Sequence, residues 1–155
     1  SGATRRYGAE LFGEAKWNQW KLHASLTQAY YRFDVVEDNS SELDGNSLPG
    51  IPNSQAFLQF EYSTLNDWQF QLTGEHIGKF YANSSNTAEI EAYQRVRFQT
   101  RKGINFLWGQ MDVFAGIHNL FDVTYFDNIR LNAFGSRFYE PAPGRNFFGG
   151  ISFGF

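Results

Sequence analysis

Residues able to carry out covalent chemistry are sparse in this chain. None of its 155 residues is a cysteine, which removes thiol nucleophiles, zinc–thiolate sites and disulfides from consideration. The three histidines, His23, His76 and His118, lie far apart in the sequence, and no serine stands in a recognisable triad context. The sequence therefore predicts no catalytic residue, no metal ligand and no cofactor, and we do not expect an enzyme.

Charged residues form a second set, and within each segment they lie an even number of positions apart. With 13 basic and 16 acidic residues the net charge is −3, and no basic patch suggests a nucleic-acid partner. Mixed signs at this density favour a wall of paired charges over a catalytic cluster. The set comprises Arg6, Glu10, Glu14, Lys16, Lys21, Glu61, Glu75, Lys79, Arg95, Arg97, Arg101 and Asp112.

Extended strands must position these charges, because apolar and polar residues alternate with a period of two. In the clearest segment, Trp68, Phe70 and Leu72 share one face while Gln69 and Gln71 share the other. No run approaches the ~18 apolar residues of a membrane-spanning helix. Seven strands are expected, at about 3–16, 19–33, 54–63, 67–80, 92–102, 109–120 and 145–155.

The expected connections alternate strictly between short and long. The short ones lie near 17–18, 64–66 and 103–108, and the long ones, rich in Asn, Ser, Gly, Asp and Pro, at 34–53, 81–91 and 121–144. In an antiparallel up-and-down barrel, this alternation places every short turn at one end and every long loop at the other. The sequence therefore predicts an all-β fold, a partial transmembrane β-barrel of about seven strands.

Aromatic residues, 19% of the chain, support a membrane environment. All four tryptophans flank the short turns, and other aromatics gather at the long-loop end, as the two aromatic belts of a bilayer-spanning barrel would. A soluble β-sandwich filled with aromatic residues is the alternative interpretation. The residues are Trp17, Trp20, Trp68 and Trp108 at one end, and Tyr30, Tyr31, Phe80, Tyr81, Tyr93, Phe121 and Tyr125 at the other.

Three segments carry a family resemblance that covers essentially the whole chain. Asn119-Leu120-Phe121-Asp122 resembles the element before the last extracellular loop of TonB-dependent outer-membrane receptors. The stretch 137–147, RFYEPAPGRNF, is similar to the closing signature of that family, and 46–53, NSLPGIPN, resembles a lead-in to one of its descending strands. Physically, the prolines and glycines fix the register of the next strand, and Asn119 and Asp122 can cap a strand end.

The C-terminal residues resemble the assembly signal of outer-membrane barrels, with Gly150, Phe153 and Phe155 in the expected places. Phe148 departs from that pattern, which has a polar residue two places before the glycine. Seven strands with a periplasmic C-terminus cannot close alone. We therefore expect residues 1–155 to be the C-terminal part of a receptor barrel, ending at its natural last residue, with the plug domain and earlier strands lying elsewhere.

The resemblance implies a function and a location in the bacterial outer membrane. Such receptors import scarce nutrients, most often ferric siderophores, and they work with the TonB complex through the plug, while the barrel-assembly machinery recognises the last strand. The long loops are then candidate ligand-contacting surfaces, in which Tyr81, Tyr125, Arg130 and Arg137 suit an anionic or aromatic chelate. A small barrel enzyme and a soluble carbohydrate-binding β-sandwich are the alternative functions.

Overall fold

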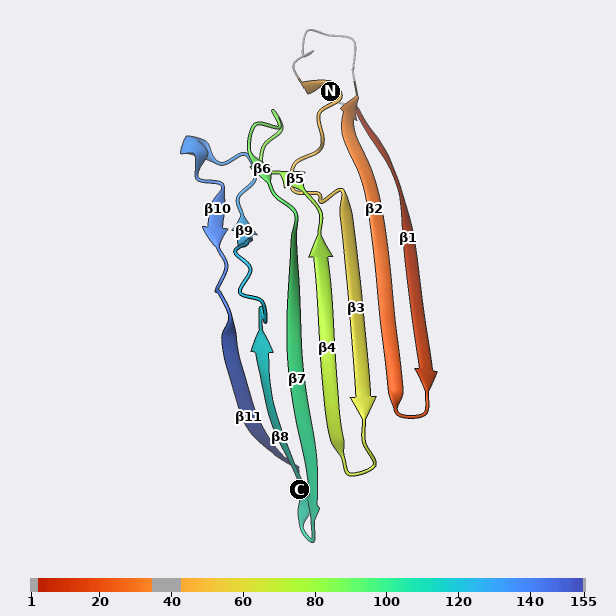
Figure 1. Ribbon diagram of the computed structural model, residues 1–155. Coiled ribbons are helices and arrows are strands. Elements are labelled where there is room, and N and C mark those ends of the chain that lie inside the picture. The colour runs from red at the N-terminus through yellow and green to blue at the C-terminus, as the bar shows by residue number, and fades with distance from the viewer. Residues whose placement is uncertain (1–2, 35–42, 155) are drawn as a thin grey trace.

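Seven long strands form one antiparallel sheet in the computed structural model, which describes residues 3–34 and 43–154. Their order in the sheet is β1-β2-β3-β4-β7-β8-β11, so neighbours in the sheet follow one another along the chain (Figure 1). Within the described residues β1 and β11 are the two edges, and the sheet does not close on itself. The strands are β1 (Ala3–Trp17), β2 (Trp20–Asp34), β3 (Ser54–Ser63), β4 (Trp68–Ile77), β7 (Tyr93–Phe106), β8 (Gly109–His118) and β11 (Asn146–Gly154).

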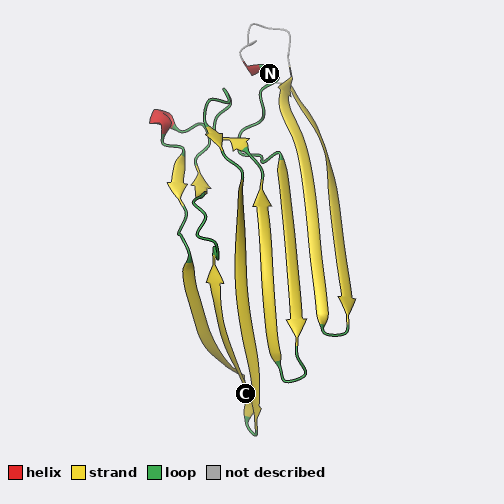
Figure 2. Cartoon of the chain, in the orientation of Figure 1, coloured by secondary structure: helices red, strands yellow, loops and turns green. Residues whose placement is uncertain are grey.

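The short connections all lie at one end of the sheet and the long ones at the other, as the sequence predicts (Figure 2). Asn18 and Asp67 adopt positive φ values of 50° and 59° in two of the tight turns, a conformation that Asn and Asp tolerate. The third turn is shorter than the expected 103–108 connection. Strand β7 continues to Phe106, which pairs with Gly109, so only Leu107 and Trp108 form the turn.

The strand register separates two faces of the sheet. The first face is mainly apolar or aromatic; one cross-strand row runs from Leu22 through Phe60, Leu72 and Phe98 to Ile117. We call this the apolar face. Leu58 and Leu72 on this face are 52% and 44% exposed, as expected of side chains that meet lipid.

Tryptophans mark the turn end of the apolar face. Trp20 stacks on Trp17 and lies 4.1 Å from Tyr62 between ring centroids, and Trp68 stacks on Phe70. The ammonium group of Lys102 lies 5.7 Å from the Trp68 ring and reaches a backbone carbonyl in the adjacent turn. This arrangement of aromatic rings beside a cation is typical of the membrane–water interface.

The opposite face, which we call the polar face, carries paired charges across neighbouring strands. The ion pairs join Lys21 to Glu61 at 3.7 Å, Arg95 to Glu75, and Arg101 to Asp112 at 2.6 Å. The pairs follow the register, because Lys21 is opposite Glu61 and Glu75 is opposite Arg95. The expected wall of mixed charges is therefore present.

The long connections contain short strands that the sequence pattern does not reveal. Strands β5 (Phe80–Tyr81) and β6 (Glu89–Ile90) pair with each other, as do β9 (Phe126–Ile129) and β10 (Tyr139–Pro141), with the 3-10 turn η2 (Phe134–Ser136) between the latter two. Among the described residues, no helix is long and apolar enough to cross a membrane.

The three long connections pack into one layer over the end of the sheet. Ala82, Ile90 and Phe138 are buried together, Ile90 to 2% exposure, although they come from two different connections. The third connection joins through hydrogen bonds: the Asn86 side chain accepts from the Ser47 amide at 2.7 Å and donates to its carbonyl at 2.9 Å. We call this assembly the loop layer.

Candidate functional site

A small cavity opens on the polar face just below the loop layer. Its volume is about 190 Å³, and strands β4, β7 and β8 supply most of its wall. The remaining wall comes from the connection that follows β8. The lining residues are Thr73, Glu75, Arg95, Val96, Arg97, His118, Asn119 and Tyr125.

Tyr125 closes one side of this cavity. Its side chain is buried, stacks on Tyr93 with 4.8 Å between ring centroids, and receives a hydrogen bond from Arg95 at 3.3 Å. Arg95 in turn pairs with Glu75. The prediction that Tyr93 and Tyr125 belong to a membrane belt is wrong. Tyr93 alternates with the apolar residues of β7 and so lies with Arg95 on the polar face, and Tyr125 lines the cavity on that same face.

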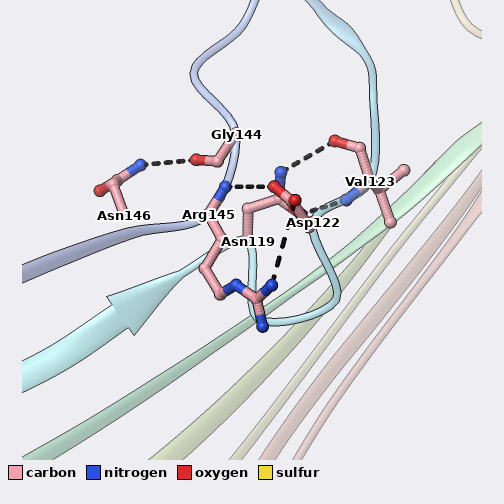
Figure 3. Close-up of polar contacts among 6 residues, drawn as sticks. All are labelled: Asn119, Asp122, Val123, Gly144, Arg145 and Asn146. Atoms are coloured by element: carbon pink, nitrogen blue, oxygen red, sulfur yellow. Dashed lines mark hydrogen bonds and ion pairs between the residues drawn. The ribbon is translucent and has the colours of Figure 1, made fainter.

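A network of polar contacts directs the chain toward Tyr125. The Asn119 side chain, 4% exposed, accepts a hydrogen bond from the Val123 amide at 2.9 Å and donates to the Val123 carbonyl at 2.8 Å (Figure 3). The Asp122 carboxylate accepts a hydrogen bond from the Arg145 amide at 2.7 Å. The Asp122–Arg145 hydrogen bond therefore joins the segment 119–122, after β8, to the segment 137–147, before β11. The side-chain to backbone hydrogen bonds of Asn119 and Asp122 confirm their expected capping role.

Gly144 makes the second of these contacts possible. A Cβ atom at this position would lie 2.8 Å from the Asp122 carboxylate, so any side chain would push the carboxylate away. Glycine therefore leaves the Asp122 carboxylate free to reach the Arg145 amide.

The other three candidate ligand-contacting residues lie in the loop layer, outside the cavity of Tyr125. Tyr81 lines a separate cavity of about 290 Å³, together with Tyr31, Arg32 and Lys79. A hydrogen bond to Glu89 raises the pKa of Tyr81, so its phenol stays neutral. Arg130, the residue after β9, pairs with Glu140 of β10, and Arg137 is exposed directly after η2. The structure does not gather the four residues into a single site.

Three residues of the polar face were not singled out as ligand contacts from the sequence. Arg97 lies 5.2 Å from the ring centroid of Phe148, and His118 lies 4.5 Å from the same ring. The Phe148 ring lies against Gly116, where a Cβ atom would clash with it. A signal for Phe148 was present in the sequence, because it stands where the assembly signal of outer-membrane barrels has a polar residue.

The histidines lie apart from one another and from any acidic cluster. His76 is on the apolar face, where its Nε2 is 3.3 Å from the Ser54 hydroxyl, and His23 is 3.8 Å from Glu14 on the polar face. Within residues 3–34 and 43–154, no group of three His, Cys, Asp or Glu side chains could hold a metal ion.

The expected assembly signal lies on β11 and beyond. Gly150 is opposite Phe114, whose ring occupies the space that a side chain at Gly150 would need, and Phe153 is 57% exposed on the apolar face. Phe155 lies outside the described residues. Recognition of these residues during assembly stays a prediction.

Comparison with known proteins identifies the family. The model for the TonB dependent receptor-like β-barrel matches residues 1–120, which is most of the chain. This chain belongs to that family, a family of outer-membrane transport receptors, and its location is the outer membrane.

Solved structures share the fold. The chain is similar to the siderophore receptor PiuA from Acinetobacter baumannii, with 23% identity and a TM-score of 0.79 over 97% of this chain and 21% of that one. The ferric citrate transporter FecA is 18% identical, with a TM-score of 0.82 over 98% of this chain and 24% of FecA. The copper transporter OprC is 22% identical, with a TM-score of 0.73 over 98% of this chain and 24% of OprC. The chain thus spans about a quarter or less of the length of these relatives.

Proposed function

We propose that this chain is the C-terminal part of the barrel of a receptor that imports a ferric siderophore or another iron chelate. In this proposal the earlier strands pair with the free edges of β1 and β11, and the plug domain fills the space in front of the polar face. The observation that carries the proposal is the loop layer, a pre-assembled outer surface above a charged wall. Both features suit capture of a polar ligand followed by its passage along the barrel.

An iron chelate is favoured by the chemistry of the candidate contacts. Tyr81, Arg130 and Arg137 place phenol and guanidinium groups in the loop layer, and these groups recognise anionic or aromatic chelates. PiuA and FecA are described as a siderophore receptor and a ferric citrate transporter, which supports the same ligand class.

Copper is the second candidate, because OprC is a copper transporter with a similar fold. Copper(I) prefers thiolate and thioether ligands. This chain has no cysteine, and its single methionine, Met111, lies at the turn end of the sheet, far from the loop layer. The chain therefore offers copper no soft ligand among the residues that would meet it first.

Three partners follow from the proposal. The TonB complex acts through the plug, and outer-membrane lipid covers the apolar face. The barrel-assembly machinery recognises Gly150 and Phe153 of β11 together with the last residue, Phe155. Strand addition to the unpaired edge of β11 is the expected mode for the assembly contact.

A transport assay with the full-length protein tests the proposal. A strain that lacks its gene is grown under iron limitation and complemented with the wild-type gene. Uptake of radiolabelled iron is then measured with citrate, catecholate and hydroxamate chelates, alongside copper uptake. Gene-dependent uptake of at least one iron chelate supports the proposal, while gene-dependent copper uptake alone, or none, contradicts it.

A further inference from the structure

We infer that a groove on the apolar face binds one acyl chain of a lipid in the outer leaflet, and that Gln94 holds a hydroxyl group of that chain. The groove has a volume of about 440 Å³ and lies across β2, β3, β4 and β7. All four are inner strands of the sheet, so their neighbours on both sides are present in this chain. The inference concerns the outward surface of the barrel and does not depend on which ligand is imported.

Small side chains form the bottom of the groove. Ala24, Ala56 and Gly74 lie on the apolar face in two neighbouring cross-strand rows. A Cβ atom added at Gly74 would meet no atom within 4 Å, so the space above this residue is open. The next row toward the turns carries large side chains, namely Leu22, Phe60, Leu72 and Phe98. A hollow between large apolar side chains offers a hydrocarbon chain more contacts than a flat surface does.

The outer end of the groove lies near the boundary of the membrane. His76 follows Trp68 by eight residues along β4, which is about 20 Å at the usual rise and tilt of a barrel strand. The apolar band of such barrels is about 25 Å tall, and Trp68 marks its turn end. His76 and Gln94, which are directly opposite each other, therefore lie where acyl chains join the lipid headgroups.

Gln94 gives this end of the groove a polar group. Its side chain is exposed on the apolar face, and no hydrogen bond of its amide is found within residues 3–34 and 43–154. His76 is already engaged, because its Nε2 lies 3.3 Å from the Ser54 hydroxyl. A polar group that faces lipid is costly without a partner. An amide both donates and accepts, so a hydroxyl group, which does the same, satisfies it better than an ester carbonyl, which only accepts.

These features favour one kind of lipid. The long connections of an outer-membrane barrel are extracellular, so Gln94 lies at the level of the outer leaflet. Lipid A, the membrane anchor of lipopolysaccharide, fills that leaflet and carries hydroxyl groups on its acyl chains close to the headgroup. Ordinary phospholipid chains have none. The occupant of the groove is therefore an acyl chain of lipid A.

The test uses the full-length receptor, stripped of lipid in detergent and titrated with lipid A or with dipalmitoyl phosphatidic acid, whose chains carry no hydroxyl group. Native mass spectrometry measures the affinity of the first lipid bound, and lipid A should bind more tightly. Gly74→Leu should weaken lipid A about tenfold, because the leucine side chain occupies the groove. Gln94→Leu should weaken lipid A about fivefold, the loss of one neutral hydrogen bond, and should leave phosphatidic acid unchanged.

Two variants on the apolar face but outside the groove are the matched controls. Ala115→Leu adds bulk on β8, and Thr100→Leu removes a polar side chain from β7, so both should bind lipid A like the wild type. Ala56→Leu replaces Gly74→Leu if that variant does not assemble. Equal affinity for the two lipids, or unchanged lipid A binding in Gly74→Leu or in Gln94→Leu, overturns the inference. A loss of equal size in the matched control does so too.

Discussion

The carboxylate of Asp122 accepts a hydrogen bond from the backbone amide of Arg145 at 2.7 Å, across 23 residues of sequence. This contact joins the end of β8 to the start of β11, and Asp122 holds it from a positive φ of 57°. This hydrogen bond therefore fixes the place where the chain rejoins the sheet after the last long connection.

Replacement of Asp122 should loosen the start of β11. Asp122→Ala removes the acceptor and places alanine at positive φ, so local opening at residues 145–148 should become easier by about 1–2 kcal/mol. Asp122→Asn keeps an acceptor and tolerates that φ, and should behave nearly like the wild type. Amide hydrogen exchange of the full-length protein measures the effect. Asp127→Ala, which changes another exposed aspartate of the same connection, is the control and should leave exchange unaltered.

Loss of the Asn86 side chain should separate the loop layer. Asn86 holds Ser47 through two hydrogen bonds from a φ of 56°. Asn86→Gly preserves that backbone conformation but removes both bonds, and should expose the layer to protease several-fold faster, as expected for a loss of about 1 kcal/mol. Limited proteolysis of intact cells provides the measurement.

Ser85→Ala is the control for this experiment, because the Ser85 hydroxyl contacts only Thr87 within the same loop. It should be cleaved at the wild-type rate. Equal cleavage of the Asn86→Gly and wild-type proteins would mean that the loops are held together by other contacts.

The β9–β10 pair should weaken in acid. Hydrogen bonds from Asn128 and Arg130 lower the pKa of Glu140 below its ordinary value of 4.5. A depressed carboxyl pKa means that the stabilisation is complete above pH 4.5 and is lost as the pH falls through the lower, folded-state value. Amide exchange at residues 126–141, corrected for its intrinsic pH dependence, should accelerate in that range in the wild type. Glu140→Gln should show no such transition, and a transition of equal size in this variant would contradict the assignment.

Much of the sheet could be predicted from the sequence because alternation with a period of two is a strong signal over ten or more residues. The strand ranges agree with the structure to within a few residues, and the two faces have the expected composition. The short strands β5, β6, β9 and β10 could not be predicted, because two to four residues carry no periodicity. They form only because the connections pack on one another.

The candidate site was harder to predict for a related reason. Tyr125 belongs to a connection, where no alternation indicates which side a residue faces, and the Asn119 turn sends it to the polar face. Phe148 could be recognised from the sequence as an exception. Its role beside Arg97 depends on Gly116, a neighbour across the sheet that the sequence alone does not pair with it.

That pairing leads to a prediction about two glycines. A Cβ atom at Gly116 would meet the Phe148 ring and lie 2.7 Å from the Phe98 carbonyl oxygen, whereas one at Gly74 would meet nothing within 4 Å. Gly116→Ala should therefore destabilise the barrel by about 1–3 kcal/mol, as overpacking does. Gly74→Ala should be neutral or slightly stabilising. Thermal unfolding of the full-length protein, followed by gel mobility of heated and unheated samples, compares the two, and equal behaviour would argue against the Phe148 position.

The central claim is that one face of this sheet meets lipid and the other meets the barrel interior. Because this chain has no cysteine, single cysteines can be placed at each position from Gln69 to Leu72 of β4, in a full-length protein without other reactive thiols. Labelling by a water-soluble maleimide in native membranes should alternate, with modification at 69 and 71 and protection at 70 and 72. Uniform labelling, or the opposite alternation, would contradict the account.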